Sequence, residues 1–227
     1  MLRLKKTLIC ACLLVSFNSI AAGMVPETSL LIINEDEQGA SMDVKNTDEN
    51  AQLLYTKIVD LPDDKQPTLI VTQPVVRVDA GKTQRVRFVL KEGEPLKVEH
   101  FKRVIFTTIP QRENNKVKVV FSQNLPVIIH PTDLAVNIEP WKDLTWQIKN
   151  GDVTVENNTP YVVRMEQKIK LLPSGTIAKF SKTYLLPNEK LIASAIGKIP
   201  SSDKKIELYP ATRYGYKAKS FIADIQQ

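Results

Sequence analysis

The sequence predicts an all-β protein built from two β-sandwich domains in tandem. Short segments alternate apolar and polar residues, turn-forming residues separate these segments at regular spacing, and one break near the middle divides the chain into halves of similar size. No helix-length window has apolar positions at helical spacing with caps at both ends. Many short strands with regular turns are typical of sandwiches rather than of parallel α/β sheets.

Period-two alternation marks the expected strands, because successive side chains of a strand point to opposite faces of its sheet. The clearest alternations are the segments 42–44, 54–58, 76–78, 86–89, 117–121, 153–155, 162–165 and 205–209. Turn chemistry lies between them, as in Asp79-Ala80-Gly81. Aspartate, asparagine, proline and glycine favour turns, so these positions bound the predicted strands.

One boundary near the middle divides the chain into two domains. The strand that ends at Ile129 runs into His130-Pro131-Thr132-Asp133, and a new set of strands begins near Trp141. We place the linker at 130–135, the first domain at 22–130 and the second at 136–227. Each domain then has about the 100 residues of one immunoglobulin-like sandwich.

The first 21 residues are expected to be a signal peptide. Three basic residues, the last at Lys6, precede the apolar run 8–15, and small residues follow it. Cleavage is expected after Ala21, with Ala22 as the close alternative. A membrane anchor is the other interpretation, but the run is shorter than the about 20 apolar residues that span a bilayer. The mature chain is therefore expected to be exported.

The positions of the cysteines and the net charge argue against thiol chemistry and against nucleic-acid binding. Cys10 and Cys12 both lie in the leader, so the mature chain has no disulfide or thiol chemistry and depends on its hydrophobic core. Loss of the three basic leader residues lowers the net charge from +6 to +3. The remaining basic residues are spread along strands, so nucleic-acid binding loses its compositional support.

Catalytic and metal chemistry also have little support. The only histidines are His100 and His130, and neither has metal-ligand spacing to an acidic neighbour. No glycine-rich phosphate loop, Gly-x-Ser-x-Gly turn or paired carboxylate motif is present. We therefore expect both histidines at the surface or in interdomain packing, and we expect no enzyme activity, catalytic residue, metal site or cofactor. A periplasmic enzyme is therefore only the third hypothesis, after the two binding functions described below.

Several motifs follow one another in a characteristic order. They are the segments 42–46, 70–74, 78–88, 109–110, 155–163 and 185–187, of which Thr159-Pro160-Tyr161 is the most specific. This succession resembles the PapD-like periplasmic chaperones of the chaperone-usher pathway and covers essentially the whole mature chain. The resemblance implies two immunoglobulin-like β-sandwich domains arranged at an angle around a cleft, located in the periplasm.

The resemblance also implies a function in pilus assembly. A pilin subunit is an incomplete sandwich whose apolar groove and unpaired backbone groups favour aggregation. The chaperone binds, caps and stabilises such fimbrial subunits by donor-strand complementation and delivers them to an outer-membrane usher. Nucleic acid and membrane insertion are not expected, whereas an exposed apolar edge favours a self-capping dimer of the free chain. The alternative is a secreted immunoglobulin-like adhesion or binding module.

By resemblance, the donor strand is the last strand of the first domain, Lys116 to Val127. One row of its side chains is expected to enter the subunit groove, namely Val117, Val119, Phe121, Gln123 and Leu125. Lys118 and Val120 occupy the opposite face. The alternative is that the same row faces the protein's own core, because alternation alone does not decide between the two faces of a strand.

The charges that hold the subunit differ from those of the best-known members. Those members grip the subunit's terminal carboxylate with an arginine in the first strand and a lysine late in the donor strand. Alignment places Ser29 and Pro126 at these positions, so both anchors are missing. The strand that contains Arg103 resembles its counterpart in non-classical chaperones, whose arginine substitutes for them. We therefore expect Arg103 as the carboxylate anchor, supported by Lys102 and Lys118; the alternative is a solvated strand charge.

Three further charged residues resemble the family's interdomain network. They are Arg87 and Glu99 in the first domain and Asp203 in the second. A network of this kind would fix the angle between the two sandwiches, although exposed ion pairs usually contribute less than about 1 kcal/mol.

Overall fold

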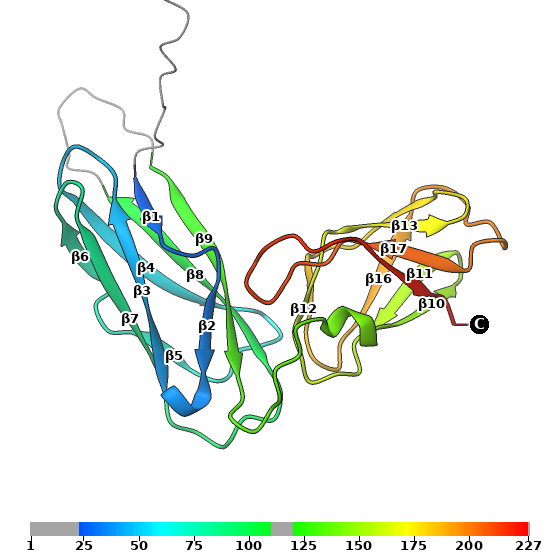
Figure 1. Ribbon diagram of the computed structural model, residues 1–227, viewed down its shortest axis with the longest axis horizontal. Helices are drawn as coiled ribbons and strands as arrows, with labels where there is room; N and C mark the ends of the chain where they lie inside the picture. Colours follow the sequence, from blue (N-terminus) through cyan, green and yellow to red (C-terminus); the bar gives the residue numbers. More distant parts are fainter. Residues whose placement is uncertain (1–22, 110–119, 227) are drawn as a thin grey trace, which may run out of the picture.

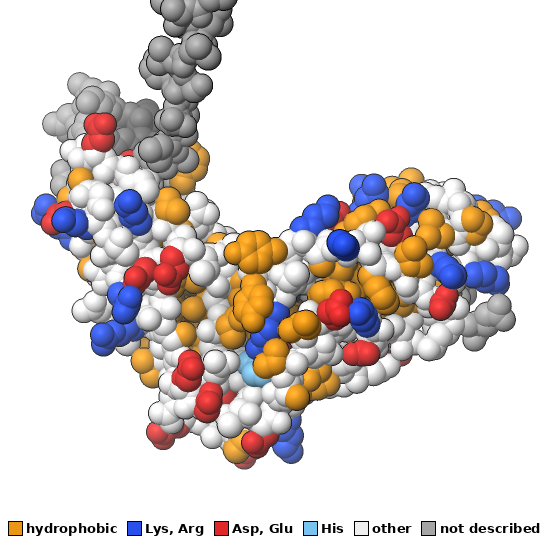
Figure 2. Space-filling view, viewed as in Figure 1, with side chains coloured by type: hydrophobic (Ala, Val, Ile, Leu, Met, Phe, Trp, Pro, Cys, Tyr) orange, Lys and Arg blue, Asp and Glu red, His pale blue; other side chains and the backbone are white. Residues whose placement is uncertain are grey.

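The computed structural model describes residues 23–109 and 120–226, and in this part of the chain it is all β apart from two short 3-10 helices. Two bodies of β-strands are joined at an angle (Figure 1), and the space-filling view shows a notch between them (Figure 2). The all-β prediction is confirmed. The predicted leader and the donor-strand residues Val117, Lys118 and Val119 lie outside the described residues.

The first domain contains nine strands in one curled sheet with the order β5-β7-β3-β2-β9-β8-β4-β6, and β1 pairs with β3. Their bounds are β1 (Met24–Pro26), β2 (Leu31–Asn34), β3 (Gly39–Asn46), β4 (Gln52–Asp60), β5 (Leu69–Val71), β6 (Val75–Val78), β7 (Thr83–Leu90), β8 (His100–Ile109) and β9 (Ser122–His130). The short helix η2 (Glu35–Glu37) connects β2 to β3. All pairs are antiparallel except β2 with β9. β2 pairs with β3 on one side and with β9 on the other, so it connects the two halves of the sandwich.

Alternation in the sequence becomes alternation in burial. In β7, Val86, Phe88 and Leu90 are buried, whereas Arg87 and Val89 between them are exposed. The buried residues pack into one core with side chains from β2, β3, β4, β8 and β9. Burial of each large apolar side chain stabilises the fold by about 1.5–3 kcal/mol, which explains why this register is preferred over one shifted by a single residue.

The second domain starts with the short helix η3 (Pro140–Asp143) and has a seven-stranded sheet with the order β10-β11-β16-β14-β13-β17-β18, plus the pair β12–β15. The bounds are β10 (Thr145–Lys149), β11 (Asp152–Glu156), β12 (Val163–Arg164), β13 (Lys168–Leu172), β14 (Ile177–Lys179), β15 (Tyr184–Leu185), β16 (Lys190–Ala195), β17 (Lys205–Leu208) and β18 (Phe221–Asp224). Its core surrounds Trp146, which is fully buried and lies 6.2 Å from Phe180 between ring centroids.

The two domains meet over a small apolar interface. β9 ends at His130 and η3 begins at Pro140, so the connection runs through 131–139, of which the predicted linker 130–135 covers the first half. Side chains from both domains form one buried cluster: Leu30, Leu61, Phe101, Ile128, Val162 and Leu186. Hydrophobic side chains also gather at the surface of the notch (Figure 2). The loop between β17 and β18 reaches from the second domain toward the first (Figure 1).

Candidate functional site

β9 has one open edge. Ser122 to Ile129 pair with β8 on one side, whereas β2 pairs on the other side only with Val127 to His130. Within the described residues, the segment 122–126 therefore has a strand on one side alone. An unpaired strand edge is a template for pairing with another chain.

The direction of the backbone groups on this edge follows from one hydrogen bond. Thr108 N–H donates to the carbonyl of Phe121 at 3.5 Å, so Phe121 directs its polar backbone groups toward β8. Because neighbouring residues of an antiparallel strand alternate in direction, Ser122, Asn124 and Pro126 direct theirs away from β8. Proline has no amide hydrogen, so the open edge offers the amides of Ser122 and Asn124 to a partner.

The described part of the predicted donor row divides into exposed and packed residues. Phe121 is 64% exposed, and Gln123 is exposed as well. Leu125 instead packs against the first domain's own core, so at this position the alternative interpretation holds. Gln123 and Leu125 lie opposite the core residues Phe106 and Val104 of β8. A strand added here would therefore extend both the sheet and the core.

Arg103 lies beside this edge. It is directly opposite Pro126 in the β8–β9 register, which is the position where the usual lysine is missing. Its Nε donates to Asn124 Oδ1 at 2.8 Å, and its Nη2 donates to the Asn124 carbonyl at 2.7 Å. Burial lowers the pKa of Arg103, and the nearby Tyr184 of the second domain acts in the opposite direction. The predicted anchor thus lies at the domain boundary, half-buried.

Lys102 occupies the other face of β8, and its predicted role as a supporting anchor is wrong. Its side chain is fully buried in the first domain, where Nζ donates to Asp60 Oδ1 at 2.5 Å and to the carbonyl of Lys65 at 3.2 Å. Adjacent residues of a strand point to opposite faces, so Lys102 and Arg103 do not both face the cleft. Lys118 lies outside the described residues.

A second arginine, Arg164, approaches the cleft from the second domain. Its Nη1 is buried without a hydrogen-bond partner. Burial lowers the pKa of Arg164, and the charge of Arg103 lowers it further. Sequence reasoning missed Arg164, although a charged residue between the apolar Val163 and Met165 was a signal available in the sequence.

The interdomain charge network is centred on Glu99, which is 2% exposed. Its Oε1 accepts from Arg213 Nη1 at 2.5 Å and bonds His130 Nδ1 at 2.9 Å, and its Oε2 accepts from the Val162 amide at 2.9 Å. His130 Nε2 lies 2.9 Å from the carbonyl of Leu134. Both ring nitrogens of His130 thus face oxygen atoms that accept hydrogen bonds. One buried acid thus joins β9 to the second domain.

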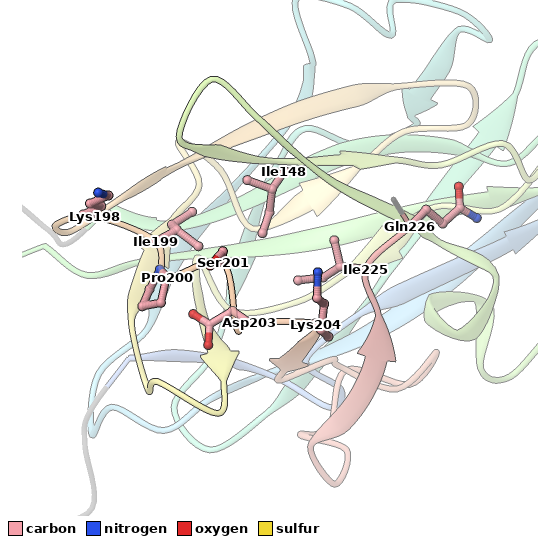
Figure 3. A pocket seen from close by; sticks show the side chains of 9 residues that line it. All are labelled: Ile148, Lys198, Ile199, Pro200, Ser201, Asp203, Lys204, Ile225 and Gln226. Carbon is pink, nitrogen blue, oxygen red and sulfur yellow. The ribbon is translucent and has the colours of Figure 1, made fainter.

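The other two predicted members of this network are wrong. Arg87 is exposed on β7 and forms no ion pair among the described residues. Asp203 is buried, but it accepts from the amide and hydroxyl of Ser174 at 2.9 and 2.6 Å, entirely within the second domain. It lines a pocket near the C-terminus (Figure 3). Arg213 takes the expected role from a loop that carries no motif.

Neither histidine belongs to a metal or catalytic centre in the described part of the chain. His100 Nδ1 lies 2.6 Å from Asp64 Oδ1, and His130 belongs to the network around Glu99. The residues 23–109 and 120–226 contain no group of three or more His, Cys, Asp or Glu side chains that could hold a metal ion. In the same residues, no helix has the length and apolar character needed to cross a membrane.

These features define a class: a two-sandwich protein that carries, in the part of the chain described by the structure, an open strand edge beside the domain boundary and arginines without acidic partners. The chain belongs to the PapD-like family of pilus-assembly chaperones. Residues 23–135 match the family described as "Pili and flagellar-assembly chaperone, PapD N-terminal domain". The chain is 46% identical over 215 residues to the "Uncharacterized fimbrial chaperone YhcA" of Escherichia coli, covering 93% of this chain and 94% of that protein.

Other comparisons agree with this family. The chain is 29% identical over 175 residues to the "Chaperone protein FimB/FhaD" of Bordetella pertussis, covering 71% of this chain and 68% of that protein. The crystal structure of the E. coli chaperone DraB has a TM-score of 0.72 at 19% identity, covering 90% and 99% of the two chains. A structure of the Salmonella enterica SafA pilin in complex with the SafB chaperone matches with a TM-score of 0.72 at 19% identity, covering 91% and 98%. The predicted family and the two immunoglobulin-like domains are confirmed.

Proposed function

We propose that this chain is a periplasmic chaperone that binds and caps pilus subunits by donor-strand complementation and delivers them to an outer-membrane usher. The open edge of β9 beside the cleft is the observation that carries the proposal. A subunit that lacks one strand has unpaired backbone groups and an apolar groove. An added strand supplies hydrogen bonds to those groups and apolar side chains for the groove.

The donor row of the proposal is Val117, Val119, Phe121 and Gln123, with Leu125 left to the protein's own core. Phe121 supports this assignment because it is a large apolar side chain that the free protein leaves in water. Moving such a side chain from water into an apolar groove contributes about 1.5–3 kcal/mol. The subunit's backbone pairs with the amides of Ser122 and Asn124.

Arg103 is the proposed anchor for the subunit's terminal carboxylate. Its half-buried guanidinium is near the open edge and has no carboxylate partner among the described residues. An unpaired charge that is partly removed from water is stabilised when an opposite charge binds it. Anchoring one end of the subunit's last strand would fix the register of the strand along β9.

The test is co-expression of the chaperone with pilins encoded beside it, followed by recovery of the chaperone–subunit complex from the periplasm. Phe121→Ser should reduce the affinity roughly 10- to 100-fold, as expected from the lost burial of one large side chain. The matched control is Ile196→Ser, because Ile196 is 62% exposed in the second domain away from β9. Both variants should fold, since both side chains are largely in water.

Equal recovery of the subunit with wild type and with Phe121→Ser would show that β9 is not the donor strand. Failure of wild type to protect any co-expressed pilin would reject the chaperone role itself. The role needs no catalytic group, and we propose no enzyme activity. The periplasmic location is checked by cell fractionation and by the intact mass of the mature chain, which should begin at Ala22 or Gly23.

A further inference from the structure

Two arginines, one from each domain, lie on the two sides of the domain boundary. Arg103 belongs to β8 of the first domain and Arg164 to β12 of the second. Among residues 23–109 and 120–226, neither forms an ion pair with a carboxylate. Arg103 bonds only the neutral Asn124, and Arg164 Nη1 is buried with no partner. Such a pair costs stability in the empty protein.

A pair of aromatic rings brings the two arginines together. Tyr184 lies directly opposite Arg164 in the β12–β15 register. Its ring is 4.9 Å from that of Phe101, which is two residues before Arg103 and on the same face of β8. The ring contact therefore places the two arginine-bearing strands against each other across the domain boundary. Burial first, and then the charge of Arg103, lower the pKa of Arg164, in agreement with this placement.

The loop between β17 and β18 lies beside the Arg164 guanidinium. A Cβ atom added at Gly215 would lie 2.8 Å from Ser29 Oγ and 3.8 Å from Arg164 Nη1, so the first domain, the loop and the guanidinium meet at this point. Gly215 also has φ of +88°, a backbone conformation that favours glycine. Arg164 is thus built into the contact between the domains.

We propose that the subunit's terminal carboxylate binds between Arg103 and Arg164, and that the bound carboxylate joins the two domains. This inference rests on the chaperone function proposed above. A carboxylate has two oxygens, and each accepts hydrogen bonds from a guanidinium fork. Its negative charge would remove the repulsion between the arginines and satisfy donors that the empty cleft leaves without partners. The second domain would then take part directly in holding the subunit.

The first experiment uses the free chaperone and acetate, the simplest methyl-bearing carboxylate, as the probe. About 100 mM acetate, compared with chloride at equal ionic strength, should raise the thermal midpoint Tm of wild type by about 2–4 °C. Neutral acetamide should not. Arg103→Gln and Arg164→Gln should each abolish the acetate shift, and each should raise the Tm without acetate because the repulsion is gone. An acetate shift that persists in Arg164→Gln would overturn the proposal.

The second experiment measures recovery of a co-expressed pilin from the periplasm. Arg164→Gln should weaken the complex about 10- to 100-fold, as Arg103→Gln does, since charge-assisted hydrogen bonds are lost. Arg164→Lys, which keeps the charge, should restore part of the affinity. The control Arg77→Gln, at an exposed residue of β6 paired with Asp79, should have no effect.

The outcomes separate the two proposals. If Arg103→Gln and Phe121→Ser weaken the complex but Arg164→Gln does not, the chaperone function stands and the shared carboxylate site is wrong. If wild type itself protects no pilin, the chaperone function fails, and the acetate experiment alone then decides whether the two arginines bind a carboxylate.

Discussion

Two buried asparagines organise equivalent turns in the two domains. Asn46 is the last residue of β3, and Asn157 directly follows β11; both side chains are fully buried. Asn157 Nδ2 donates to the carbonyls of Tyr161 and Leu186 at 2.7 and 2.9 Å. Its Oδ1 accepts from both the amide and the hydroxyl of Thr159. The specific Thr159-Pro160-Tyr161 motif is therefore a turn held from inside by one amide.

Asn157→Ala should lower the free energy of unfolding by about 2–4 kcal/mol, because two carbonyls and the Thr159 hydroxyl lose their partner in a buried site. Chemical denaturation monitored by tryptophan fluorescence measures the change. The control is Asn158→Ala at the neighbouring exposed residue, which should change stability by less than about 0.5 kcal/mol. Equal effects of the two changes would contradict the role given to the buried amide.

At the scale of single elements, β8 and β9 carry most of the proposed function. β8 turns Lys102 into the first domain and Arg103 toward the second. β9 is paired along its length with β8 but is open to a partner over 122–126. The two strands thus combine packing in the core with an open strand edge at which another chain can pair.

Amide hydrogen exchange should reveal the open edge. In the free chaperone, the amides of Ser122 and Asn124 should exchange fast, whereas those of Gln123 and Leu125 should be protected by β8. Among residues 122–125, binding of a pilin should slow exchange at Ser122 and Asn124. β7, which is paired on both sides by β3 and β5, is the internal control and should not change. Slow exchange at Ser122 and Asn124 in the free protein would mean that the edge is already covered.

Period-two alternation was sufficient to predict β3, β4 and β7, because burial on one face alone produces that pattern. It did not tell which face of β8 meets the second domain, so Lys102 was placed with Arg103. Arg164 and Arg213 were missed because their positions depend on contacts between residues far apart in the chain. The prediction for Asp203 was wrong because this residue lies in a loop, where no alternation of apolar and polar residues indicates which side chains are in contact.

At the scale of the whole molecule, Glu99 connects the domains through side chain and backbone. Its carboxylate bonds Arg213 and the Val162 amide, and its own amide donates to the carbonyl of Pro160 at 2.8 Å. The Glu99 side chain is almost completely buried, so these bonds are shielded from water. Removal of only one partner from a buried ionic group of this kind strongly destabilises a protein.

Glu99→Gln should destabilise the protein by about 3–5 kcal/mol, because Arg213 and His130 would keep their positions beside a neutral amide. Calorimetry should also resolve two transitions instead of one as the domains lose their connection. Glu94→Gln, at an exposed residue of the same loop, is the control and should behave like wild type. A single transition with unchanged Tm in Glu99→Gln would show that the apolar cluster alone couples the domains.

Pro126 gives the open edge of β9 a defined end. It has no amide hydrogen to offer, and from Val127 onward the edge is occupied by β2. A partner strand that pairs along 122–125 must therefore leave the sheet at Pro126, whatever its own length. The residue across from this exit point is Arg103. In the proposed complex, the end of an incoming strand would thus lie beside a positive charge, and one proline would set both where the backbone pairing stops and where the chain terminus arrives.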